Sequence, residues 1–200
     1  SMVLDGSIFL HTGVTILETL VSFFFVTAVG ILGAVALWSS KSLAEILDPY
    51  LVMLNSLPKS ALAPILIVWL GSSMRTIVAG MSVAIFGSIL NLYTSFMSAD
   101  PGKMTLIYTL GGKRHQVLTK VVLPSSIPAI ISNMKVNVGL CLVGVIIGEF
   151  LAARLGLGYL IIYGSQVFKL DLVLMSIVIL CILAALMYQG IALAERRAER

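Results

Sequence analysis

Few residue types in this chain could carry out chemistry, and their spacing matches no catalytic arrangement. His11 and His115 have no acid or nucleophile at a recognisable spacing, and Cys141 and Cys181 lie in apolar runs without a neighbouring His, Cys or carboxylate. A metal site or a catalytic site needs several such side chains together. We therefore expect a chain that is not an enzyme and that binds no metal ion and no cofactor.

One segment superficially resembles the end of a phosphate-binding loop, namely Gly111-Gly112-Lys113. That loop needs another Gly five residues before its Gly-Lys pair and a Ser or Thr directly after it. Ile107 and Arg114 occupy these two positions. Any ATP hydrolysis is therefore expected on a separate subunit.

The whole chain has the composition of a multi-pass membrane protein. Of its 200 residues, 59% are hydrophobic and 11% are charged, and the mean hydropathy is +1.07. Soluble domains contain about 25% charged residues. No basic run interleaved with aromatic residues is present, so nucleic-acid binding is not expected.

Five segments approach the length of about 20 apolar residues that a helix needs to cross a bilayer. They are residues 11–38, 50–71, 75–97, 127–151 and 172–194. Pro58 and Pro64 predict a kink or break in the second of them. The sequence thus predicts an all-α integral membrane protein with about five transmembrane helices.

Local sequence also predicts where helices start and where they approach each other closely. Asp followed by Pro is typical of a helix start, and it occurs at Asp48-Pro49 and at Asp100-Pro101. Ser72-Ser73 and Asp171 are candidate caps for the third and fifth spans. Small residues four apart permit close helix contact, and they form two motifs, Gly30-x-x-x-Ala34 and Gly144-x-x-x-Gly148.

The distribution of Lys and Arg predicts the orientation. Loops on one side hold eight of the thirteen, and loops on the other side hold three. The first set comprises residues 39–49, 98–126 and 195–200, and the second comprises 1–10, 72–75 and 152–171. Because basic loops stay in the cytoplasm, we expect the loop 98–126 and the C-terminus to be cytoplasmic. The N-terminus is then external, which suggests a further span upstream.

The loop 98–126 is a polar segment between apolar spans. Apolar residues recur at helical spacing on both sides of the Gly-Gly pair, namely Met104, Ile107, Tyr108 and Gly111, then Val117, Leu118, Val121 and Val122. The pattern predicts a helix, a tight turn, a second helix and a stop at Leu123-Pro124. Such a basic amphipathic hairpin either lies on anionic lipid or sits in the groove of a partner protein.

The spacing in this hairpin resembles the signature loop of bacterial ABC-importer permeases, which reads Glu-Ala-Ala, three residues, Gly, nine residues, Ile, one residue and Leu-Pro. Gly111 and Leu123-Pro124 are in register with it, and Val121 fills the Ile position. The segment Thr105-Leu106-Ile107 replaces Glu-Ala-Ala, so the acidic residue of the family is absent. The resemblance assigns an ATPase-coupling role to Thr105, Leu106, Ile107, Gly111, Gly112, Arg114, Val117, Leu123 and Pro124.

Two further segments resemble permeases of the nitrate/sulfonate/taurine type. Residues 57–71 begin Leu-Pro-Lys-Ser-Ala and end Trp-Leu-Gly, and residues 148–161 contain Gly-Glu-Phe and Gly-Leu-Gly-Tyr-Leu-Ile. The resemblance covers about residues 12–197. It implies a type I importer-like fold, with residues 1–200 as a single transmembrane permease domain. Permeases of this type usually carry one more N-terminal span.

The resemblance also implies a function and a set of partners. Two copies of the chain would form a pathway across the bacterial plasma (inner) membrane, with two ATP-binding subunits docked on the loops. An extracytoplasmic substrate-binding protein would deliver a small solute, which would be nitrate-, sulfonate- or taurine-like or a heterocyclic vitamin precursor. ATP-driven closure of the ATPases would switch the pathway between outward- and inward-facing states.

Polar side chains inside spans are costly and therefore mark candidate pathway residues. They are Asn55, Ser56, Lys59, Asn91, Asn133, Lys135, Asn137 and Glu149. Each has a structural alternative. The two lysines can snorkel to the membrane surface, the amides and the serine can bond between helices, and Glu149 can be an interfacial carboxylate.

Two other functions stay open at this point. The chain could be a self-sufficient channel or an ion-coupled secondary transporter. Secondary transporters often show two related halves, and this sequence shows no such internal repeat. It could also be a membrane scaffold whose loop recruits a cytoplasmic partner.

Overall fold

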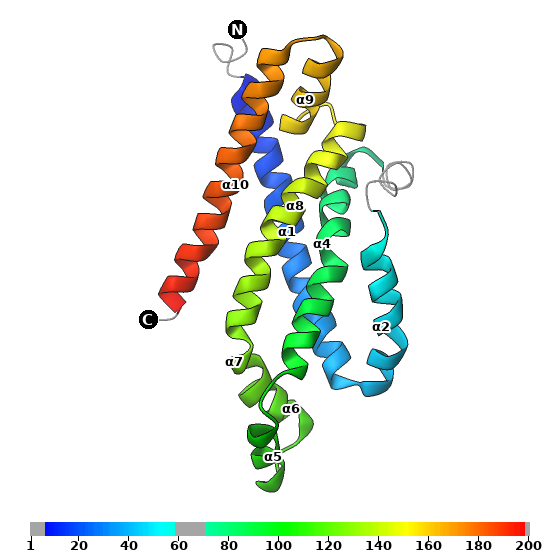
Figure 1. Cartoon of the computed structure of the whole chain (residues 1–200), viewed down its shortest axis with the longest axis vertical. Coiled ribbons are helices and arrows are strands. Elements are labelled where there is room, and N and C mark those ends of the chain that lie inside the picture. Colours follow the sequence, from blue (N-terminus) through cyan, green and yellow to red (C-terminus); the bar gives the residue numbers. More distant parts are fainter. Residues whose placement is uncertain (1–6, 59–70, 199–200) are drawn as a thin grey trace. The chain divides into compact units, whose positions relative to one another are not determined.

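The computed structural model describes residues 7–58 and 71–198, and all regular elements within these ranges are helices (Figure 1). In chain order they are α1 (Ser7–Ser39), α2 (Lys41–Ser56), α4 (Gly71–Met97), α5 (Pro101–Thr109), α6 (Arg114–Val117), the π-helix η1 (Leu118–Val122), α7 (Leu123–Ser125), α8 (Ile127–Ala152), α9 (Leu157–Gln166) and α10 (Leu170–Ala198). The predicted all-α fold class is confirmed.

Four helices of the described residues are long and apolar enough to cross a membrane. Their spanning parts are Ser7–Ser39, Thr76–Met97, Ile127–Leu151 and Leu170–Leu193. They confirm four of the five predicted spans within a few residues at each end. Most of the remaining predicted span, residues 50–71, lies outside the described residues.

The start of α2 differs from the prediction. Asp48-Pro49 was expected to begin a helix, but α2 already begins at Lys41 and contains Pro49 in its interior. Ser40 caps it, because the Ser40 hydroxyl accepts a hydrogen bond from the backbone N–H of Leu43 at 3.3 Å. The cap lies about two and a half turns before Pro49, so the proline removes one internal hydrogen bond without setting the helix start.

The other predicted helix ends are partly right. Asp100 caps α5 as expected, since its carboxylate accepts from the N–H of Gly102 at 2.8 Å and Pro101 follows at the first helical position. Ser72 and Ser73 lie inside α4, whose described part begins at Gly71. Asp171 lies in the first turn of α10 rather than before it. The predicted break at Pro58 is confirmed, because α2 ends at Ser56.

The chain divides into two compact units. Unit 1 comprises Ser1–Val26, Pro58–Ala84 and Lys135–Arg200, and unit 2 comprises Thr27–Leu57 and Ile85–Met134. The helices α1, α4 and α8 each contribute residues to both units, α9 and α10 belong to unit 1, and the hairpin formed by α5, α6, η1 and α7 belongs to unit 2.

In unit 1, α8 packs against α4 through two glycines, as the small-residue motif predicted. A Cβ atom at Gly144 would lie 2.7 Å from the backbone oxygen of Ala79 and 2.7 Å from the Cα of Gly80. A Cβ atom at Gly148 would lie 2.9 Å from the Cα of Thr76. No side chain larger than hydrogen fits at either glycine without a shift of the α4 backbone.

The short helix α9 of unit 1 begins inside a cage of side chains from α1 and α8. The backbone N–H groups of its N-cap residue and of its first two residues each have a side-chain acceptor. Gly156 N–H donates to Nδ1 of His11 at 3.0 Å, Leu157 N–H donates to the Thr15 hydroxyl at 2.9 Å, and Gly158 N–H donates to the Glu149 carboxylate at 2.6 Å. The first N–H groups of a helix have no partner within the helix. Helices α1 and α8 therefore supply the cap that α9 cannot supply itself.

Glu149 and the glycines around it fit together closely. The Glu149 side chain is fully buried and also accepts a hydrogen bond from the Thr15 hydroxyl at 2.7 Å. Gly156 has a φ of +109°, and a Cβ atom there would collide with the Glu149 carboxyl group. The Gly-Leu-Gly sequence thus lets the chain wrap around this carboxylate.

The α4–α8 contact gives the first testable prediction. We expect Gly144→Ala to lower the free energy of unfolding by about 1–3 kcal/mol, because the new methyl group overpacks against the α4 backbone. The control is Gly139→Ala on the same helix, since a Cβ at Gly139 has no atom within 4 Å. Unfolding followed by circular dichroism in mixed micelles measures both variants, and equal losses would contradict the close contact.

The cage gives the second prediction, from two threonines of α1 three residues apart. Thr15→Val leaves the N–H of Leu157 without its acceptor and removes a donor from Glu149, so we expect a loss of about 1–3 kcal/mol. Thr12→Val removes only a bond to the Ile8 backbone oxygen of the same helix and should change stability by less than about 0.5 kcal/mol. Hydrogen exchange at the start of α9 should rise in the first variant alone, and unchanged exchange there would refute the capping role.

Candidate functional site

The tight turn of the hairpin lies where the Gly-Gly pair predicted it, and each glycine is needed for a different reason. Gly111 has a backbone φ angle of +81°, which residues other than glycine rarely adopt. At Gly112 a Cβ atom would lie 2.7 Å from the backbone oxygen of Ile107, and the Gly112 N–H donates to that oxygen at 2.8 Å. The turn therefore folds the chain back directly onto the end of α5.

The base of the hairpin is buried in the core of unit 2. The second apolar stripe is confirmed as a buried face, since Val117, Leu118, Val121 and Val122 are all less than 10% exposed. Three of them join a cluster with residues of α1 and α4 and with one residue between α4 and α5, namely Ala34, Trp38, Leu92, Phe96 and Ala99. Met104, Ile107 and Leu123 pack against this cluster. The base of the hairpin thus packs against the ends of two spanning helices, α1 and α4.

The tip of the hairpin is apolar and exposed. Leu106, Tyr108 and Leu110 expose 58%, 49% and 76% of their surface. Thr105, which replaces the family's Glu, is exposed and donates its hydroxyl proton to the backbone oxygen of Pro101 at 2.9 Å. Three exposed lysines complete the charged surface of the hairpin, namely Lys103, Lys113 and Lys120.

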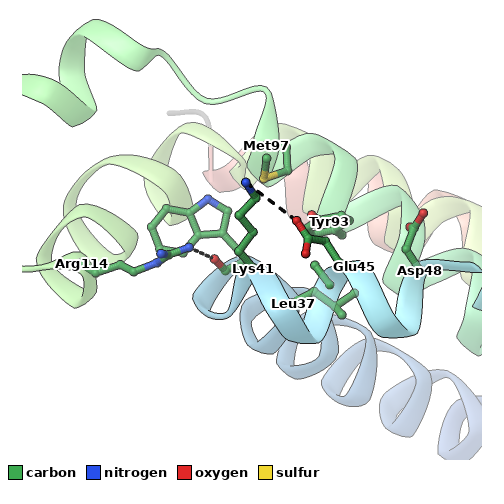
Figure 2. A pocket seen from close by; sticks show the side chains of 9 residues that line it. Leu37, Lys41, Glu45, Asp48, Tyr93, Met97 and Arg114 are labelled. Carbon is green, nitrogen blue, oxygen red and sulfur yellow. Dashed lines mark hydrogen bonds and ion pairs between the residues drawn. The ribbon is translucent and has the colours of Figure 1, made fainter.

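Arg114 joins the hairpin to the end of α1. Its Nη2 donates to the backbone oxygen of Trp38 at 2.6 Å, and its guanidinium group lies 5.1 Å from the centre of the Trp38 ring (Figure 2). A cation over an indole ring gains electrostatic energy in addition to the hydrogen bond. The sequence placed Arg114 on the polar side of the hairpin but gave no indication of this partner.

The predicted stop at Leu123-Pro124 is wrong, because the chain stays helical through α7 into α8 after a single turn residue, Ser126. Directly before Pro124 the helix widens into η1, where the N–H of Leu123 donates to the oxygen of Leu118. A proline inside a helix clashes with the carbonyl group four residues earlier. The wider π turn accommodates that ring, so the proline marks a distortion and not an end.

Unit 2 holds most of the predicted pathway amides. Asn133 donates through Nδ2 to the Ser88 hydroxyl at 2.7 Å, whereas its Oδ1 is a buried acceptor that has no partner among the described residues. Gly30 approaches the same serine closely, as expected for the glycine of the Gly30-x-x-x-Ala34 motif. Asn55 lies against Gly87. The structure therefore brings α1, α4 and α8 together around Ser88, a residue that sequence reasoning missed.

Two other predicted residues of unit 2 lie at its surface. Asn91 is exposed, and so is Ser56, whose hydroxyl donates to the backbone oxygen of Val52 at 2.9 Å. Lys59 lies outside the described residues.

The remaining candidates belong to unit 1. Asn137 is 1% exposed. Lys135 forms an ion pair with Glu195 of α10, and both side chains are about one-fifth exposed. The partner is 60 residues away in sequence, so spacing could not have indicated it. Glu149 is the cage carboxylate described above, and its hydrogen bonds give it a structural role.

The chain matches a known family over most of its length. Residues 26–200 match the family described as "Binding-protein-dependent transport system inner membrane component". The chain is 29% identical to a probable ABC transporter permease protein of Haemophilus influenzae, over 90% of this chain and 74% of that protein. It is 25% identical to the taurine transport system permease protein TauC of Escherichia coli, over 97% of this chain and 71% of that protein.

A second relative and a solved structure agree with this match. The putative aliphatic sulfonates transport permease protein SsuC of Bacillus subtilis is 26% identical, over 98% of this chain and 71% of that protein. A chain of the inward-facing MetNI methionine ABC transporter superposes with a TM-score of 0.84 at 19% identity, over the full length of both chains, which shows a shared fold. The chain belongs to the family of binding-protein-dependent transport system inner membrane components, and it is a multi-pass permease subunit of an ABC importer.

Proposed function

We propose that two copies of this chain form the pathway of an importer in which two separate ATP-binding subunits dock on the hairpins. An extracytoplasmic binding protein delivers a small solute, and the chain itself catalyses no reaction. One observation carries the proposal. The hairpin combines an exposed apolar tip with a buried base that is bonded to the end of a spanning helix.

The tip has the character of a docking surface. Exposed apolar area in water costs about 25 cal/mol per Å², so a cluster of large apolar side chains on a polar loop gains free energy when a partner covers it. Leu106 and Leu110 lie close together in sequence on this loop, and exposed lysines lie on both sides of them. Because Thr105 carries no charge, we propose that apolar contacts dominate the interface with the ATPase.

The base of the hairpin has the character of a lever. A ligand shifts a conformational equilibrium only when its contacts differ between the two states. Movement of the hairpin would change the packing of Val117 and Val122 against α1 and α4 and would pull on Trp38 through Arg114. We propose that ATP-driven motion reaches the ends of these spans by this route.

The polar groups in the described spans favour a solute that donates hydrogen bonds over an anion. Glu18 and Asn133 each keep a buried acceptor oxygen without a partner among the described residues, and the positive charge of Lys135 is balanced by Glu195. Relatives are named for aliphatic sulfonates, taurine, formylaminopyrimidine and riboflavin. We propose that this chain takes a solute from the same range, with the heterocyclic class favoured over the anionic class.

The docking proposal predicts the effect of a charge at the tip. Leu110→Asp should abolish association with the ATPase, because docking would bury the carboxylate in an apolar interface. Phe168→Asp is the control, since Phe168 is 90% exposed and lies between α9 and α10, away from the hairpin in sequence. Native mass spectrometry of the tagged chain from its host membranes, together with ATP hydrolysis by the purified complex, compares the two variants. Full ATPase binding by the Leu110 variant would overturn the docking surface.

The turn predicts a second, graded effect. Gly111→Val forces a β-branched residue into a positive φ at a cost of about 1–3 kcal/mol, and it should abolish ATPase binding and uptake while the protein still inserts. Gly111→Asn should retain most of both, because asparagine tolerates this conformation. Normal uptake by the valine variant would refute the lever.

A further inference from the structure

A cavity of about 360 Å³ lies in unit 2, between the start of α2, the ends of α1 and α4, and Arg114 of the hairpin (Figure 2). This volume falls within the range of about 300–1,000 Å³ that is typical of small-molecule sites. The cavity is partly open, and no residue assigned to the solute pathway lines it. Its walls combine an apolar part with four charged side chains.

The apolar part of the cavity comes from the ends of two spans. Leu37 and Trp38 are within three residues of the end of the span Ser7–Ser39, and Tyr93 and Met97 are within five residues of the end of the span Thr76–Met97. Trp and Tyr are typical of the level at which lipid headgroups meet the hydrocarbon core. Because these residues lie at the ends of two spans, we expect the cavity at the depth of the lipid headgroups.

The charged side chains are ordered by sign along the cavity. Lys41, Glu45 and Asp48 project from one face of α2 at helical spacing. Figure 2 shows Arg114 and Asp48 at opposite ends, with Lys41 and Glu45 between them. The two cations thus share one end of the cavity, and the two carboxylates lie toward the other end.

These four charges are available to a ligand. The Lys41–Glu45 pair is 3.8 Å long, and its side chains are 85% and 67% exposed, so it contributes little and can exchange partners. Arg114 uses one of its five N–H donors on Trp38. Asp48 forms no ion pair with any described residue.

We propose that this cavity binds the phosphoethanolamine headgroup of a membrane phospholipid. The phosphate lies between Arg114 and Lys41, and the ammonium group donates hydrogen bonds to Glu45 and Asp48. The acyl chains follow the apolar wall of Leu37 and Met97 into the bilayer. The site is independent of the transported solute.

The chemistry of the cavity disfavours other headgroups. A purely anionic headgroup would face two carboxylates without a cation to satisfy them. A choline group has no N–H to donate to those carboxylates, and Arg114 already covers one face of the Trp38 ring that a choline cage would use. Free phosphoethanolamine has the same charges but leaves the apolar wall uncovered.

Lipid binding to the full chain tests the proposal. The wild-type chain in detergent micelles is titrated with dioleoyl phosphatidylethanolamine, phosphatidylglycerol or phosphatidylcholine, and bound lipid is counted by native mass spectrometry. We expect phosphatidylethanolamine to bind about tenfold more tightly than the other two, the factor that corresponds to 1.4 kcal/mol. The double variant Glu45→Gln, Asp48→Asn should lose this preference.

A matched control removes two carboxylates outside the cavity, through Asp100→Asn and Asp171→Asn. Asparagine caps a helix as well as aspartate does, so α5 keeps its start, and the preference should persist. Displacement of the lipid by equimolar free phosphoethanolamine would support the headgroup chemistry but assign it to a soluble ligand. Equal or tighter binding of phosphatidylglycerol, or an unchanged preference in the Glu45/Asp48 variant, would overturn the proposal.

Discussion

A backbone polar group that is buried from water must find its hydrogen-bond partner within the protein, and the start of α9 depends most directly on this constraint. Three successive N–H groups there are satisfied by side chains of α1 and α8, and the fully buried Glu149 is held between the Thr15 hydroxyl and the Gly158 N–H. Helix α9 could not begin at this point without both neighbours. The start of the short helix therefore depends on the packing of α1 against α8, since separation of these two helices would leave buried N–H donors without partners.

The same constraint explains why so few polar groups in the described spans are free to contact a solute. Glu149 is used for capping, and Lys135 is balanced by an acid from another helix. The Asn133 amide donates to Ser88, and three buried oxygens have no partner among the described residues, on Glu18 in unit 1 and on Thr27 and Asn133 in unit 2. Solute contacts in these spans therefore depend on these few oxygens and on shape, which fits a family in which a separate binding protein takes part in transport.

How much could be predicted from the sequence depended on the distance over which each feature acts. The Asp100 cap, the Gly111 turn and the buried stripe around Val117 are encoded within a few residues, and they were predicted correctly. The predicted start of α2 was wrong because the prediction rested on Asp48-Pro49, whereas Ser40, which was not among the predicted caps, caps the helix. The Arg114–Trp38 and Lys135–Glu195 contacts join residues at least 60 positions apart. Spacing carries no information about such pairs, so only the fold could reveal them.

The position of Arg114 changes the view of how the hairpin recognises its partner. A basic loop suggests docking by charge, but this cation faces inward onto Trp38 and stabilises the root of the hairpin. Thr105 bonds to its own helix and presents no acid, so the surface left for a partner consists of Leu106, Tyr108 and Leu110 with lysines around them. Contacts of this kind gain free energy from buried area and depend little on ionic strength. Docking should therefore be selective through shape, whereas Arg114 holds the hairpin on the end of α1.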